Sequence, residues 1–169
     1  MNTKPIRTGW RAVLVAVAFG VGPFSAADEA PDDLQAGIDA FNRGDLPGAM
    51  TLYEKAAEAG SPEAQVRLAY LLDYGEENDK AVYWYRAAAE QGYPEGLTGL
   101  AEMYAKGEGV PEDPRQAREL FEKAGEAGHA GAIRVLIATY EKGGLDVEKD
   151  ASKLAYWQEK QASLNTSGN

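Results

Sequence analysis

Few residues in this chain have the types and spacing that metal binding requires. The sequence contains one histidine, His129, and no cysteine, so a zinc site built from those ligands is not expected. Three acids alternate in the segment DVEKD, which suggests calcium. An EF-hand loop that began at Asp146 would need Gly at its sixth place and Glu at its twelfth. Those places hold Ala151 and Trp157, so we expect a solvated loop and no metal site.

The sequence also lacks a clear nucleophile with its base. No serine has a lysine three residues later, as the S-x-x-K motif of β-lactamases requires, and the nearest match is Thr139 with Lys142. Gly107 and Gly109 are not followed by the G-K-[ST] of a phosphate-binding loop. Acidic residues are numerous, but nothing selects one pair for glycan hydrolysis. We therefore expect no catalytic residues and no cofactor, with a periplasmic hydrolase of cell wall or β-lactams as the alternative.

The first 27 residues have the layout of a secretory signal peptide. Basic residues at 4, 7 and 11 precede the apolar run AVLVAVAFGV, and small residues precede a cleavage site after Ala27. The alternative is an uncleaved membrane anchor, but the apolar run has only 10 residues, against about 20 needed to span a bilayer. We expect a bacterial protein in the periplasm or secreted, with no membrane insertion after cleavage.

The composition is acidic. The 169-residue chain has a formal net charge of −10. Removal of residues 1–27 takes away three basic residues and no acidic ones, which changes the net charge to −13. An acidic surface repels phosphate backbones and anionic lipids. We therefore expect no nucleic acid and no lipid surface among the partners.

A phrase of about twelve residues occurs three times and indicates a stacked repeat. YEKAAEAGSPEA, which begins at Tyr53, returns as YRAAAEQGYPEG from Tyr85 and as FEKAGEAGHAGA from Phe121. The glycine that the three phrases share recurs after 32 and then 36 residues. A period of this size is typical of solenoids built from helix pairs.

Each copy of the repeat predicts two helices. In one helix, small, aromatic and small residues at i, i+4 and i+7 share a face. These predicted core residues are Ala49, Tyr53 and Ala56, then Ala81, Tyr85 and Ala88, then Ala117, Phe121 and Ala124. The glycine that follows, at 60, 92 or 128, is expected to end the helix with a positive φ. The next helix begins at Ser61 or its counterparts and buries Ala64, Leu68 and Leu72 in its first copy.

These elements predict an all-α fold of about four antiparallel helix pairs over residues 28–163, with no room for a second domain. In the last helix Trp157 and Gln158 take core places. A glutamine at such a place is typical of an end helix with one wet face. Residues 164–169 are expected to be a disordered tail.

The segment KGEGVPEDPRQARELFEKAGEAGHAGA, at residues 106–132, closely resembles the Sel-one-like repeat (SLR), a relative of the tetratricopeptide repeat (TPR). The shared features are G-x-G-V, an acid before K/R-x-A, and A-x-x-x-G-H/Y. His129 stands at the last place of the third motif, for which the resemblance implies a packing or capping role. The first pair looks more like a plain TPR, and the second lacks G-x-G-V. The resemblance covers nearly all of residues 28–163. It implies a right-handed superhelical solenoid that binds proteins, without catalytic activity, such as an exported adaptor or regulator in envelope assembly, signalling or secretion.

In such a solenoid the first helix of each pair lines the concave side, where a partner binds. Residues of these helices that face away from the core are therefore candidates, and tyrosine often anchors interfaces. The predicted protein-binding residues are Val66, Tyr70, Asp73, Tyr74, Thr98, Glu102, Lys106 and Arg134. The alternative is that the tyrosines cover neighbouring helix surface. We expect a monomer whose partner is an envelope or periplasmic protein or peptide; the sequence does not separate an adaptor from a chaperone or a regulator.

Overall fold

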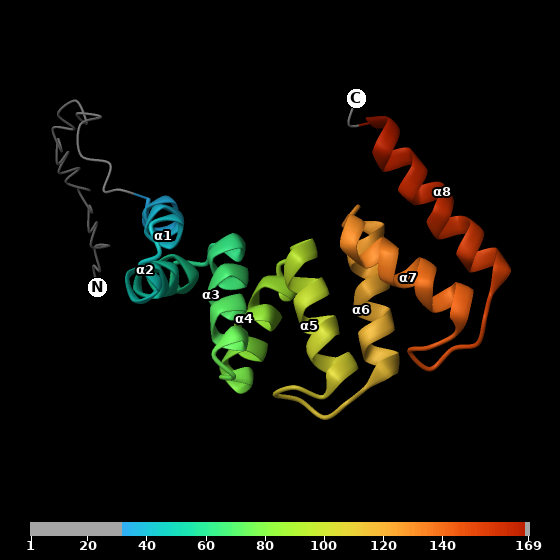
Figure 1. The fold of residues 1–169 in the computed structure, drawn as a ribbon, viewed down its shortest axis with the longest axis horizontal. Helices are drawn as coiled ribbons and strands as arrows, with labels where there is room; N and C mark the ends of the chain where they lie inside the picture. The colour runs from blue at the N-terminus through green and yellow to red at the C-terminus, as the bar shows by residue number, and fades with distance from the viewer. Residues whose placement is uncertain (1–31, 168–169) are drawn as a thin grey trace, which may run out of the picture. The chain divides into compact units, whose positions relative to one another are not determined.

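The computed structural model describes residues 32–167, and these fold into eight α-helices (Figure 1). The helices are α1 (Asp33–Asn42), α2 (Leu46–Glu58), α3 (Pro62–Tyr74), α4 (Asn78–Glu90), α5 (Pro94–Lys106), α6 (Pro114–Glu126), α7 (Ala130–Lys142) and α8 (Ala151–Ser167). Outside them, the described chain has one isolated bridge between Gly144 and Val147. The predicted all-α fold of four helix pairs is confirmed. The predicted signal peptide at 1–27 lies outside the described residues.

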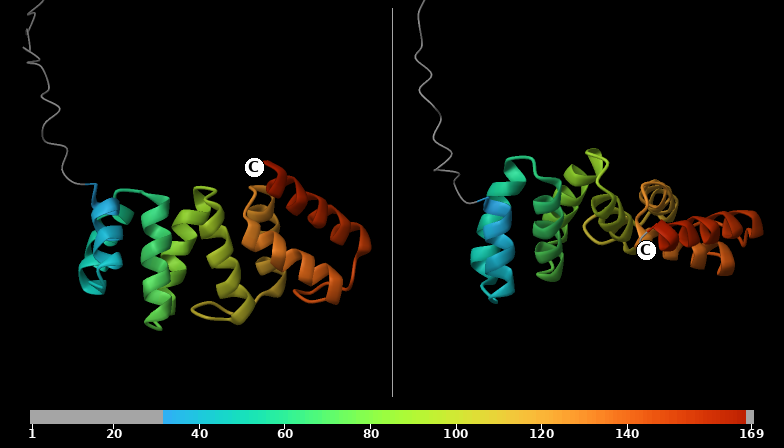
Figure 2. Two further views of the ribbon diagram at one scale, coloured as in Figure 1. Left: turned by 45° about the horizontal axis from the view of Figure 1, so that its top comes forward. Right: turned by 90° about the horizontal axis from the view of Figure 1, so that it is seen from above.

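Each helix packs against the next one along the chain, and α3 also contacts α5. The views in Figures 1 and 2 show this succession from α1 to α8. Contacts that stay between neighbouring elements are the defining property of a solenoid. The α3–α5 contact joins the first helices of the second and third pairs. No helix in the described part of the chain is both long and apolar enough to cross a membrane.

Side chains that cap the helix starts explain several of the boundaries. Asp45, Ser61 and Asp113 each accept the backbone N–H of the residue three places on, at 2.9, 3.3 and 3.0 Å respectively. Each cap is followed by a proline at one of the first two helical positions, where the missing N–H is not needed. The predicted start of a helix at Ser61 is confirmed.

The second helices of the first three pairs end with one motif. After α4, the Tyr93 N–H donates to the Ala88 carbonyl at 3.1 Å and the Gly92 N–H donates to the Ala89 carbonyl at 2.9 Å. This is the Schellman motif, and Gly92 adopts the left-handed φ of 74° that it requires. The same two bonds end α2 and α6. The predicted helix-ending glycines at 60, 92 and 128 are therefore confirmed.

The core consists of the predicted small–aromatic–small faces, all of which are buried. Glycines on the first helices receive the aromatic rings. A Cβ placed at Gly99 of α5 would lie 2.4 Å from the Tyr85 ring, and one at Gly37 of α1 would lie 2.7 Å from the Tyr53 ring. Because no side chain stands there, each ring lies directly against the backbone of its neighbouring helix.

The last helix, α8, has a different character from the others. Among the described side chains of α8, only that of Trp157 is buried, at 3% exposed. The Trp157 ring lies against Gly125 of α6. Gln158 is exposed, as expected for the wet face of an end helix. The helix continues to Ser167, and Leu164 packs against the core. The helical part therefore extends beyond residue 163, into the segment expected to be a tail.

Candidate functional site

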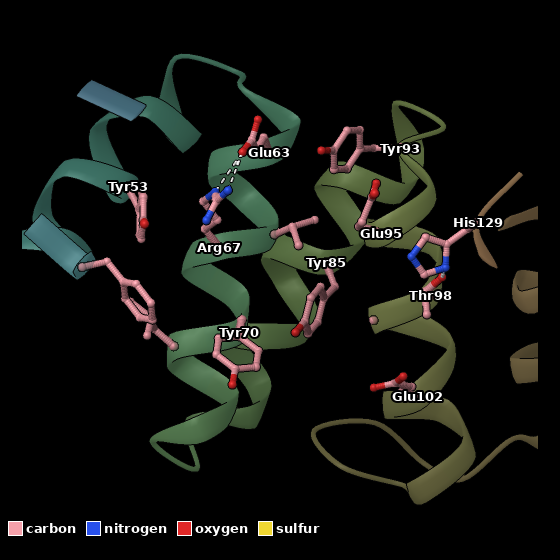
Figure 3. A pocket seen from close by; sticks show the side chains of 14 residues that line it. Tyr53, Glu63, Arg67, Tyr70, Tyr85, Tyr93, Glu95, Thr98, Glu102 and His129 are labelled. Carbon is pink, nitrogen blue, oxygen red and sulfur yellow. Dashed lines mark hydrogen bonds and ion pairs between the residues drawn. The ribbon is translucent and has the colours of Figure 1, made fainter. Parts of the chain in front are cut away.

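A groove of about 610 Å³ lies along α3 and α5, the first helices of the second and third pairs (Figure 3). These two helices supply most of the lining. The remainder comes from α1, α2, α4 and the residues that precede α5 and α7. The groove therefore spans neighbouring repeats, and its shape depends on how those repeats stack.

Aromatic rings form much of the wall of this groove. Tyr85 and Tyr53 are 6% and 1% exposed, whereas Tyr70 is 57% exposed and Phe41 is 38% exposed. Tyr93 adds a half-buried ring at the start of α5. Burial, followed by the charges of nearby carboxylates, raises the pKa of Tyr85, so its hydroxyl keeps its proton at neutral pH. The wall therefore consists largely of apolar ring surface, with the polar hydroxyl groups of the tyrosines at the ends of the rings.

One side of the groove holds an ion pair on α3. Arg67 donates from Nε and Nη2 to Oε1 of Glu63, at 2.9 and 2.7 Å. Partial burial acts to lower the pKa of Arg67, but the hydrogen bond and charge of Glu63 outweigh it, so the pKa is raised. The Tyr53 hydroxyl interacts electrostatically with this guanidinium. That hydroxyl is buried and makes no hydrogen bond within residues 32–167, an uncommon state for a buried polar atom.

The other side of the groove holds carboxylates without a partner (Figure 3). Glu95 and Glu102 stand seven residues apart on α5, and neither forms a hydrogen bond or ion pair with any described residue. Partial burial raises the pKa of Glu102. The positive charge of Lys106 acts to lower this pKa, and the negative charge of Asp73 acts to raise it. Lys106 is itself paired with Glu108 at 3.3 Å. This side therefore carries net negative charge, which Lys106 offsets only in part.

His129 comes from the following repeat and closes the groove beside Thr98. Its Nδ1 accepts the N–H of Ala132 at 3.2 Å, as the N-cap of α7, and lies 2.9 Å from Oγ1 of Thr98. Because Nδ1 accepts a hydrogen bond from an amide, the neutral ring carries its proton on Nε2. The predicted capping role of His129 is confirmed.

The groove brings together half of the predicted protein-binding residues. Val66, Tyr70, Thr98 and Glu102 line it. Asp73 does not line it but lies close enough to act on the charge of Glu102. Their binding of a partner stays a prediction.

The other three predicted residues, Tyr74, Lys106 and Arg134, do not line the groove. Tyr74 and Lys106 stand eight residues after Val66 and Thr98. Eight residues rotate an α-helix about 80° beyond two full turns, whereas seven return within about 20° of the start. The stripe that faces the groove therefore follows the i, i+3, i+7 spacing, and these side chains turn away from it.

Several lining residues were not among the sequence-based candidates. Arg67 and Glu63 have opposite charges at i and i+4, and Glu95 stands seven residues before Glu102, so both spacings were present in the sequence. His129 reaches the groove from the next repeat. Its position depends on the stacking of repeats, which no spacing within one helix reveals.

A second hollow, of about 760 Å³, lies between α6 and α8. Two of its carboxylates are paired. Glu122 accepts from Tyr140 and from Lys153 at 3.3 Å, and Glu126 accepts from Tyr156 at 2.6 Å and from Lys160. These bonds attach α8 to the preceding repeat.

The acidic segment DVEKD, which suggested calcium, contacts an arginine through its first residue. Asp146 lies 3.4 Å from the guanidinium of Arg115, at the start of α6. Among residues 32–167, no three acids or histidines gather in a way that could hold a metal ion.

Stacked helix pairs with a groove along their first helices define the class of this protein as an α-solenoid repeat protein. The chain belongs to the Sel1 repeat family, whose model matches residues 37–61, 62–93 and 94–129. The matched spans include most of the first pair, which resembled a TPR, and the second pair, which lacks G-x-G-V. Proteins of this family generally act as scaffolds for protein–protein interactions. The fourth pair, α7 and α8, lies outside the matched spans.

Solved structures share this fold. A Sel1 repeat protein from Oxalobacter formigenes is 27% identical with a TM-score of 0.70, over 78% of this chain and 55% of that one. The protein c5321, a protective antigen of uropathogenic Escherichia coli with an SLR fold, is 32% identical with a TM-score of 0.69, over 78% of this chain and 30% of that one.

One relative among curated sequences is the uncharacterized protein NMB1327 of Neisseria meningitidis. It is 38% identical over 77 residues, which make up 46% of this chain and 16% of that protein. The chain spans little more than half of the Oxalobacter protein and smaller parts of the other two relatives.

Proposed function

We propose that this protein is a non-catalytic scaffold, exported from a bacterial cell, that binds a segment of a partner protein in the groove along α3 and α5. In this role it acts as an adaptor or regulator of an envelope, signalling or secretion system. The observation that carries the proposal is the exposed ring of Tyr70, 57% exposed, beside the buried rings of Tyr53 and Tyr85 in one groove.

Such a wall suits a protein partner for physical reasons. Tyrosine offers a large contact area, and tyrosines in well-packed pockets commonly dominate the energy of protein interfaces. Tyr70 has no hydrogen bond or ring contact within the described residues that would assign it a structural duty. The groove also spans two repeats, so it is long enough to hold more than one side chain of a bound segment.

The test uses Tyr70 and Tyr74, which stand one turn apart on α3. Both are exposed, at 57% and 80%, but only Tyr70 lines the groove. A photo-reactive phenylalanine analogue at position 70 should cross-link a partner in living cells, and the same analogue at position 74 should do so far less. With that partner purified, Tyr70→Ala should weaken binding by about 2 kcal/mol, while Tyr74→Ala leaves the affinity nearly unchanged. Equal cross-linking at the two positions would contradict the groove assignment.

Two further measurements address export and the absence of catalysis. N-terminal sequencing of the protein from cells should find a chain that begins at Asp28, after the proposed cleavage site. A mature chain that still carries Lys4 would count against export. Turnover of nitrocefin or of muropeptides by the purified protein would overturn the non-catalytic part of the proposal and favour a hydrolase.

A further inference from the structure

We infer that the groove is specific for a basic peptide segment, with a lysine or arginine side chain seated between Glu95 and Glu102. The inference rests on the proposed function above and names the chemistry of the partner. It depends on charges and aromatic rings that line this groove.

The charge balance of the groove is negative. Its one arginine, Arg67, is already neutralised by Glu63 at 2.7 Å. Glu95 and Glu102 have no such partner among residues 32–167. Partial burial removes some of the water around Glu102 and raises its pKa. A cation bound beside this carboxylate would replace the lost water and stabilise its charged form.

The two acids lie two turns apart on the face of α5 that lines the groove. Seven residues of α-helix span about 10 Å along the axis, and Thr98 lies between the two acids on the same face. The rings of Tyr70, Tyr85 and Tyr93 line the same hollow. Aromatic faces attract ammonium and guanidinium groups and cover the aliphatic stem of lysine or arginine.

The opposite side of the groove indicates that the cation belongs to a peptide. Tyr53 is 1% exposed, its hydroxyl has no hydrogen-bond partner in the described chain, and its side chain lines the groove. That buried oxygen acts on the guanidinium of Arg67. The main-chain carbonyls of a bound segment would accept from the N–H groups of Arg67 that do not donate to Glu63. A small cation held at Glu102 would leave that side empty.

The test presents the full-length protein with three immobilised pools of random nonapeptides that differ only in the central residue. One pool has lysine or arginine at the centre, one has glutamate and one has alanine. The protein should bind the basic pool at least about tenfold better than the other two, because a hydrogen-bonded charge pair is the difference between them. In Glu95→Gln/Glu102→Gln this preference should fall to about twofold or less.

A matched control removes the same two charges elsewhere. Glu58 and Glu90 are exposed on α2 and α4 and do not line the groove. The variant Glu58→Gln/Glu90→Gln has the net charge of the groove variant and should keep the full preference for the basic pool. Loss of the preference in both variants would assign it to the overall charge of the protein and overturn the site.

The remaining outcomes separate this inference from the proposed function. If the protein binds the alanine or glutamate pool best, the basic specificity is wrong and the proposed groove stands. If none of the pools binds, both proposals are overturned. Circular dichroism and thermal melting should show that the groove variant folds, because neither acid has a partner to lose. The single variant Glu102→Gln, which should lose part of the preference, provides the same test if the double variant does not fold.

Discussion

Gly92 shows how one residue sets a repeat boundary. Its φ is 74°, and no atom lies within 4 Å of the position that a Cβ would take, so a side chain there would be strained by the backbone alone. Gly75 ends α3 with a φ of −84°, and a Cβ there would make ordinary contacts at 3.4 Å or more. The two positions therefore isolate the effect of the sign of φ.

The expected result is a difference of sign between two alanine variants. Gly92→Ala should lower the free energy of unfolding by about 1 kcal/mol, because alanine is strained at positive φ. Gly75→Ala should leave it unchanged or raise it by about 0.5 kcal/mol, because alanine has less freedom in the unfolded chain. Urea denaturation of both variants measures the difference. Equal destabilisation would mean that the left-handed conformation is not what requires Gly92.

At the scale of elements, the approach of α4 to α5 depends on Gly99. The Tyr85 ring fills the place of its missing side chain, at 2.4 Å from the Cβ position. Gly99→Ala should gain about 1 kcal/mol of helix propensity, but displacement of a buried ring should lower the free energy of unfolding by about 1–3 kcal/mol in total. In the background of Tyr85→Ala the same change should become neutral or stabilising. Thermal melting of the four proteins checks this cycle, and simple additivity would contradict the contact.

The attachment of α8 predicts a dependence on pH. The hydrogen bonds from Lys160 and Tyr156 lower the pKa of Glu126. A carboxyl whose pKa is lower in the folded state stabilises that state above its ordinary pKa, and this stability is lost as the pH falls through the folded value. We expect weaker hydrogen-exchange protection of α8 near pH 3 than at pH 6, after correction for intrinsic exchange rates.

The control for this pH effect is Glu126→Gln, which keeps the size of the side chain and removes its titration. This variant should lose part of the pH-dependent protection of α8, and the part that remains belongs to other acids. An unchanged pH profile would show that Glu126 does not fasten the helix.

The sequence predicts best what lies inside a single helix. The buried faces around Tyr53, Tyr85 and Phe121 follow from spacing alone, and so do the terminating glycines, because both depend on local geometry. The groove is harder to predict, because it is made by several helices. The position of His129 beside Thr98 requires the stacking of two repeats. Whether Tyr74 lines the groove depends on which face of α3 the neighbouring helices leave open.

At the scale of the whole molecule, the described helices contact mainly their neighbours in sequence, and α3 with α5 and α6 with α8 are further pairs in contact. In a repeat array of this kind, stability is close to a sum of local terms. Trp157→Ala should therefore release α8 and speed its amide exchange, while the amides of α3 and α4 exchange as before. Tyr85→Ala, in the middle of the array, should lower the total free energy of unfolding by about 3–5 kcal/mol. Uniformly faster exchange in Trp157→Ala would show that the array unfolds only as one unit.

The unpaired hydroxyl of Tyr53 has a consequence for the evolution and engineering of this protein. A buried hydroxyl without a partner opposes folding, by about 1–3 kcal/mol, so a phenylalanine at this place would give a more heat-resistant protein. The same change would remove the oxygen that acts on the guanidinium of Arg67, whose remaining N–H groups we assign to the main chain of a bound segment. Selection for thermal endurance and selection for affinity would therefore act in opposite directions on one oxygen atom, which is the usual form of a trade-off between stability and activity.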